Sequence, residues 1–169
     1  MGLMDILEQY AGQAMAPQGD AHADFSKVAE QAPPDALGAG ITEALRNGAG
    51  GSFAASIEKL FANSNPDQRA GLLTRLIEAA GPAVLSSVAG GAFARFGQGG
   101  AGTGPAPLSP TDANSVTPAQ AGELADAAHA KDPGIIDRVG TFYSQHPMVV
   151  KALGAAALAV AMSHMARRA

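Results

Sequence analysis

The chain has no cysteine and no tryptophan, and aromatic residues make up only 5% of its 169 residues. Without cysteine there can be no disulfide, no iron–sulfur cluster and no thiolate zinc site. Hydrophobic residues reach 47%, but much of this fraction is alanine, so a core must be built from close contacts between helices. Charged residues are also sparse, at 15% compared with about 25% in typical soluble domains. This sparse polar surface indicates oligomerisation or attachment to an apolar surface.

Signals for β-strands are nearly absent as well. No stretch alternates with period two, and β-branched residues do not cluster beyond pairs such as Ile135-Ile136. Glycine, proline and polar residues instead divide the chain into short segments with helical spacing of apolar positions. We therefore predict an all-α protein, a multi-helix bundle of about eight or nine short helices.

Two of the predicted helices begin with the same capping chemistry. In the stretch NPDQ, Asn65 can cap the helix, Pro66 suits its first turn, and Gln68 can reach back to the backbone of the cap. The stretch TPAQ, from Thr117 to Gln120, repeats this arrangement. The repetition could record an internal duplication, although shared capping chemistry explains it equally well.

A stretch rich in glycine, proline and serine separates two helical halves. It covers residues 97–116 and has no regular apolar pattern, which predicts a linker. We expect an acidic helical module at residues 1–96 and a C-terminal helical segment at 117–169. The stretch just before the linker, residues 82–96, contains Gly90-Gly91, which predicts either a close backbone contact or a helix that frays into the linker.

Charge is distributed unevenly along the chain. The net charge is −4, which argues against nucleic acid as a partner because phosphate binding needs a cationic face. All acids lie at or before Asp137, whereas the residues after it carry four bases and no acid. A cationic, apolar C-terminal element could dock on the acidic body of the protein itself or on an anionic lipid surface.

The C-terminal stretch PMVVKALGAAALAVAMSHMARRA raises the question of a membrane anchor. A helix over residues 148–166 would be about 28 Å long, close to the roughly 30 Å thickness of a bilayer core. Its uncharged apolar run covers only residues 152–162 and is mostly alanine and glycine, which gain little from lipid. We therefore expect a helix packed in a core or a subunit interface, with membrane contact and a ligand-lining role as the alternatives.

The sequence offers no recognisable catalytic or metal site. The four histidines, at positions 22, 129, 146 and 164, stand in separate segments without metal-binding spacing. The glycine-rich stretches resemble phosphate loops, but no strand precedes them. We therefore predict that the protein is not an enzyme and has no catalytic residue, cofactor or bound metal, and we see no signal for a small-molecule substrate.

The opening MGLMDIL, followed by short helices punctuated by glycine and proline and by a leucine-rich central helix, resembles the YidB-like family of small bacterial all-helical proteins of unknown function. The resemblance implies a helical, cytoplasmic bacterial protein and supplies no catalytic residues. The opening also carries an acid, Asp5, and no basic segment, so we expect no secretory signal and a cytoplasmic protein, with membrane association as a variant.

These observations predict a non-enzymatic structural or adaptor protein that self-associates through its Ala/Gly-rich helices, or that binds another protein. The alternative is a peripheral membrane or apolar-surface protein that uses the N-terminal amphipathic helix and the cationic C-terminal helix. The candidate interaction residues are Leu3, Ile6, Leu7, Tyr10, Lys151, Leu153, Ala156, Val160, Arg167 and Arg168.

Overall fold

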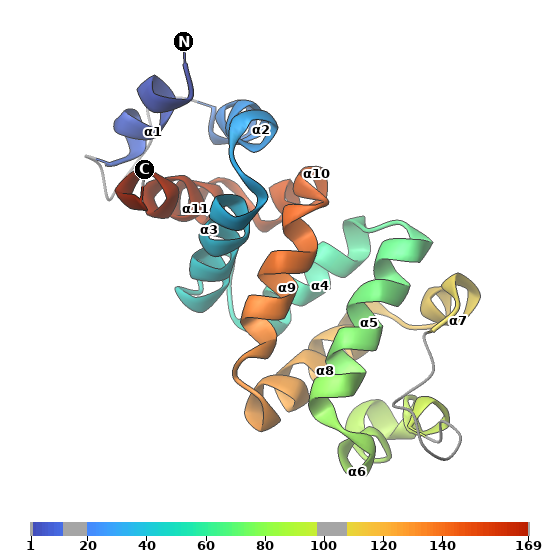
Figure 1. The fold of residues 1–169 in the computed structure, drawn as a ribbon. Helices are drawn as coiled ribbons and strands as arrows, with labels where there is room; N and C mark the ends of the chain where they lie inside the picture. The colour runs from blue at the N-terminus through green and yellow to red at the C-terminus, as the bar shows by residue number, and fades with distance from the viewer. Residues whose placement is uncertain (1, 12–19, 98–107, 169) are drawn as a thin grey trace. The chain divides into compact units, whose positions relative to one another are not determined.

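The structure, a computed structural model, describes residues 2–11, 20–97 and 108–168. These residues form an all-α bundle without strands, as the sequence predicts (Figure 1). The α-helices are α1 (Leu3–Ala11), α2 (Ala21–Gln31), α3 (Pro34–Arg46), α4 (Phe53–Asn63), α5 (Pro66–Ala80), α6 (Pro82–Leu85), α7 (Pro110–Asn114), α8 (Pro118–Lys131), α9 (Ile135–Ser144), α10 (Pro147–Val150) and α11 (Ala155–Arg168). Three short 3₁₀ helices, η1 (Val88–Gly91), η2 (Ala94–Phe96) and η3 (Lys151–Leu153), complete the described chain.

The helices form two compact units whose boundaries differ from those expected from the sequence. Unit 1 consists of residues 1–52 and 139–169, and unit 2 of residues 53–138. The expected division at 97–116 therefore falls inside unit 2. The reason is that α8, which follows the expected linker, packs against α4 and α5, which precede it.

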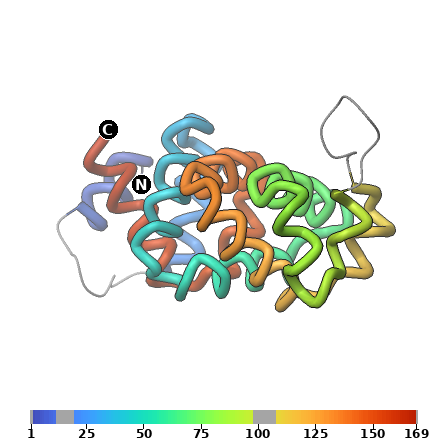
Figure 2. Tube along the Cα trace, turned by 90° about the horizontal axis from the view of Figure 1, so that it is seen from below, coloured from blue at the N-terminus to red at the C-terminus, as the bar shows by residue number. Residues whose placement is uncertain are grey.

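Unit 1 is built around α11. This helix packs against α1, α2 and α3, so the two ends of the chain contribute to one core, and Figure 2 shows α1 beside α11. The buried side of α11 presents residues at helical spacing, because positions three to four apart share a face. These residues are Ala157, Leu158, Ala161, Met162 and Met165.

Unit 2 is centred on α5, whose neighbours are α4, α6, α7 and α8. One face of α5 is rich in leucine and lies in the core of unit 2, with Leu72, Leu73, Leu76 and Ile77 all buried. Both predicted capping boxes are confirmed. Asn65 and Gln68 exchange hydrogen bonds at the start of α5, and Thr117 and Gln120 do so at the start of α8.

The predicted linker is wrong over its second half. Residues 98–107 lie outside the described part of the chain, but residues 108–116 are packed. Helix α7 contacts α5, Ala113 is fully buried, and the flanking Leu108 and Val116 are also buried. Ser109 caps α7 by accepting a hydrogen bond from the backbone N–H of Asp112. The composition predicted a linker because these few apolar residues show no periodicity.

The glycine-containing stretch 82–96 is not a continuous helix. Helix α6 ends at Leu85, and the backbone turns left-handed at Ala89 and Gly90, with φ of 50° and 65°. A Cβ at Gly90 would meet nothing within 4 Å, whereas a Cβ at Gly91 would lie 3.2 Å from the backbone carbonyl oxygen of Ser86, so a close backbone contact is present at Gly91 but not at Gly90. Each alternative is therefore met in part: the helix ends at Leu85 and two 3₁₀ turns follow it, and Gly91 lies close to the backbone of Ser86.

The C-terminal stretch also differs from the single long helix that we expected. It is divided into α10, η3 and α11, because Gly154 adopts φ 92° and ψ 165°, a conformation that side-chain-bearing residues rarely adopt. Helix α11 therefore has 14 residues and is about 21 Å long. None of the helices in the described ranges combines the length and the apolar character that crossing a membrane requires.

Candidate interaction surfaces

The predicted interaction residues of α1 are largely used inside unit 1. Ile6, Leu7 and Tyr10 are buried against neighbouring helices, and Leu3 is half-buried. The apolar face of α1 thus contacts α2 and α11. A lipid contact through this face, as in the membrane alternative, would require α1 to leave its place.

A partly buried hydrogen bond joins α1 to α2. The phenol of Tyr10, which is 3% exposed, donates to the carboxylate of Asp24 at 3.0 Å. Burial raises the pKa of the Tyr10 phenol above its ordinary value, and the bond to Asp24 raises this pKa further. The neutral phenol is therefore the form that holds α1 in place.

The predicted residues of the C-terminal stretch are divided between the core and the surface. Leu153 is buried, Lys151 and Val160 are half-buried, and Ala156 is exposed. We expected the C-terminal helix, which contains the candidate Ala156, to pack in a core or a subunit interface, but within the chain it is Ala157 that faces the core. Helical spacing alone does not fix which face of an alanine-rich helix turns inward. The remaining cationic candidates, Arg167 and Arg168, are exposed at the end of α11.

Helices α3 and α11 approach each other unusually closely. A Cβ built on Gly40 of α3 would lie 2.8 Å from the carbonyl oxygen of Ala161 and 3.1 Å from Cγ of Met165. Real Cβ atoms essentially never come within 3.0 Å of such a neighbour, so only glycine fits here. The small residues of α11 thus serve, at least in part, for packing within unit 1.

Unit 1 also contains a pocket between α2 and the stretch formed by α10 and η3. Its cavity volume is about 240 Å³. Four apolar residues, Phe25, Ala29, Pro147 and Met148, form most of its wall. The pocket is predominantly apolar, with polar groups that are few in number.

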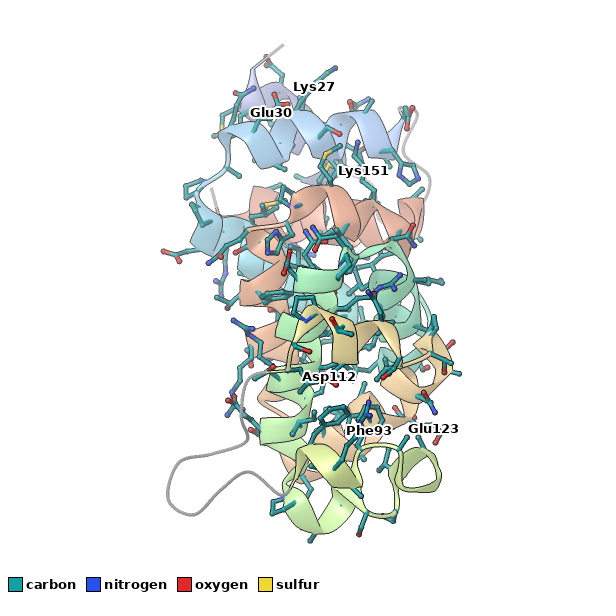
Figure 3. The ribbon with its side chains drawn as sticks, turned by 90° about the vertical axis from the view of Figure 1, so that its right-hand side faces the viewer. Lys27, Glu30, Phe93, Asp112, Glu123 and Lys151 are labelled. Atoms are coloured by element: carbon teal, nitrogen blue, oxygen red, sulfur yellow. The ribbon has the colours of Figure 1, made fainter. Side chains whose placement is uncertain are left out.

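The polar lining consists of Ser26, Glu30 and Lys151. Figure 3 shows Lys151 close to α2, with Glu30 on that helix. No hydrogen bond or ion pair joins either of these two charged side chains to another residue of the described ranges. The half-buried ammonium of Lys151 is therefore available to an anionic group brought by a ligand.

Large exposed apolar side chains occur at two positions in the described chain, and both belong to unit 1. Met148, at the pocket, is 68% exposed, and Met4, on α1, is 55% exposed. Neither was among the predicted interaction residues. The sequence signal that could have found Met4 is its place on the polar side of α1, where it shares a face with Glu8.

The described residues contain no group of three or more histidine, aspartate or glutamate side chains that could hold a metal ion. The four histidines lie on different helices or at their ends. Two of them contact aromatic rings: His129 lies 5.5 Å from Phe53 and His146 lies 5.1 Å from Phe142, measured between ring centroids. These contacts suit packing roles.

Comparison with known proteins adds no relative, since no protein-family model, no curated protein and no solved structure matches the chain. The resemblance of the opening residues to the YidB-like family stays a prediction.

Proposed function

We propose that this chain is a non-enzymatic structural or adaptor protein that self-associates through the surface of unit 1. The observation that carries the proposal is the apolar pocket between α2 and α10, with the exposed Met148 on its wall. Met148 and the apolar pocket wall adjoin each other, and contiguous apolar surface marks interaction sites because covering it with a partner removes it from water.

The volume of the pocket favours a protein partner over a metabolite. Pockets for drug-sized ligands usually enclose about 300–1,000 Å³, whereas a cavity of about 150 Å³ holds one benzene molecule. A pocket of about 240 Å³ thus suits one large apolar side chain. Single side chains in such pockets are the anchors that contribute most of the binding free energy at protein interfaces.

Helix α11 offers a second surface for association. Its outer side carries the exposed Ala155 and Ala156 and the half-buried Val160. Small residues allow the backbone of another helix to come close, so the Ala/Gly-rich character that we read from the sequence remains available on this side of the helix.

Sedimentation or light scattering over a range of protein concentrations tests the proposal. The chain has a mass of 16.8 kDa, and the average mass in solution should rise towards a multiple of this value between about 1 µM and about 1 mM. A mass of one chain over the whole range would refute self-association. Detergent should not be needed for solubility.

A further inference from the structure

We infer that the pocket between α2 and α10 receives Met4 of a second copy of this chain. The pocket of the second copy receives Met4 of the first in return, and the result is a two-fold symmetric dimer. This inference rests on the proposed self-association and names the surfaces that carry it. The pocket can hold one large apolar side chain. Two large apolar side chains are exposed among the described residues, Met4 and Met148. Met148 forms part of the pocket wall, so Met4 is the one that can enter the pocket of another copy. Methionine is flexible and polarisable, which suits an irregular pocket that already contains Phe25 and Met148.

Charge complementarity supports this pairing. Helix α1 carries Asp5 and Glu8 and no base, and both acids are exposed beside Met4. The carboxylate of Asp5 already accepts a hydrogen bond from the backbone N–H of Gly2 at 2.9 Å, so Glu8 is the acid left for a partner. The described lining of the pocket contains one base, Lys151, and one acid, Glu30, and neither has a partner among the described residues, so Lys151 is the group that can pair with an acid of a second copy. Glu8 of one copy is thus matched to Lys151 of the other.

Two-fold symmetry doubles each contact. Two-fold dimers are the commonest homo-oligomers, and in such a dimer a copy that inserts its Met4 into a neighbour receives the neighbour's Met4 in return. A closed dimer results, whereas a one-way contact would leave a free pocket and a free methionine at the ends of an open chain of copies. We therefore expect association to stop at two copies.

The test measures the dissociation constant of the dimer in variants that leave the core of unit 1 unchanged. Met4→Ala removes the anchor and leaves the pocket unfilled without adding a charge, and it should raise the dissociation constant about tenfold or more. Lys151→Glu faces Glu8 with a like charge at both contacts and should raise the constant about tenfold. The double variant Lys151→Glu with Glu8→Lys restores opposite charges and should recover most of the affinity.

Lys27→Glu is the matched control. Lys27 is exposed on the same helix as Glu30 but does not line the pocket, and Figure 3 shows it on the other side of α2 from Lys151. This variant changes the net charge as Lys151→Glu does and should leave the dissociation constant within about twofold of the wild-type value. Far-ultraviolet circular dichroism on every variant verifies that the helices are retained.

The outcomes separate this inference from the proposed function. A wild-type chain that stays monomeric refutes both. Association that is as strong in the Met4→Ala and Lys151→Glu variants as in the wild type keeps the proposed function but refutes the exchange of Met4. Equal weakening by Lys27→Glu and Lys151→Glu, or a failure of Glu8→Lys to rescue Lys151→Glu, refutes the charge pairing that supports the inference.

Discussion

The contact of α3 with α11 at Gly40 provides the sharpest test of the structure. Replacing Gly40 with alanine would place a Cβ 2.8 Å from the carbonyl oxygen of Ala161, so the backbone of one helix must move away from the other. Overpacking of this kind costs about 1–3 kcal/mol. Alanine in place of glycine within a helix stabilises by about 1 kcal/mol. We expect Gly40→Ala to lower the free energy of unfolding of unit 1 by about 0–2 kcal/mol.

Gly38, on the same helix, provides the matched control. A Cβ there would lie 3.6 Å from Cβ of Ser144 and from Cα of Thr141, which are ordinary van der Waals distances. Gly38→Ala should therefore stabilise unit 1 by about 1 kcal/mol. Since both substitutions gain the same helix propensity, the difference between the two variants isolates the overpacking cost of about 1–3 kcal/mol.

Intrinsic tyrosine fluorescence during urea unfolding measures this difference in unit 1 alone. The chain contains two tyrosines, Tyr10 and Tyr143, and no tryptophan, and both tyrosines belong to unit 1. The unfolding midpoint of Gly40→Ala should lie below that of Gly38→Ala. If Gly40→Ala unfolds at the same urea concentration as Gly38→Ala, or at a higher one, the close approach of α3 to α11 is refuted.

Three further predictions follow from single contacts. Tyr10→Phe removes the hydrogen bond to Asp24 and should lower the free energy of unfolding by about 1–3 kcal/mol. Because the pKa of Tyr10 is raised in the folded state, the contribution of Tyr10 to stability is complete below pH about 10 and is lost above it. The free energy of unfolding should therefore fall less at alkaline pH in Tyr10→Phe than in the wild type. Asn65→Ala should lower the stability of unit 2 by about 1 kcal/mol and Asn65→Gly by only a few tenths, as measured by circular dichroism; equal losses would contradict a capping role. Ala156→Asp, at an exposed position, should change the free energy of unfolding by less than about 0.5 kcal/mol, whereas Ala157→Asp, at a buried one, should lower it by several kcal/mol or prevent folding. The opposite order would show that α11 is rotated from its described orientation.

The sequence alone was sufficient for the fold class and for the start of several helices. Helical spacing of apolar residues and proline after a capping residue are local features, and they act through hydrogen bonds and packing within one or two turns. For this reason the capping boxes at Asn65 and Thr117 and the buried leucines of α5 could be predicted from the chain. The amphipathic face of α1, with Ile6, Leu7 and Tyr10 inside, could be predicted in the same way.

Features that depend on which distant segments pack against each other could not be predicted from the sequence. The packing of α7 needs the surface of α5, and neither segment shows from its own pattern that it will contact the other. The break at Gly154 is equally ambiguous, since glycine within an apolar run is compatible both with a helix and with a left-handed turn, and the φ of 92° became evident only in the structure.

Some features of the candidate interaction surfaces likewise follow from local sequence, and others depend on long-range contacts. Composition predicted small residues on α11 and a cationic end, because both are properties of the residue types themselves. Which alanine faces inward, Ala157 rather than Ala156, was decided by contacts with α1 and α3. The pocket was decided by tertiary structure alone, because it joins residues 25–30 to residues 147–151, which lie more than a hundred positions away in the chain and come together only when α10 packs on α2.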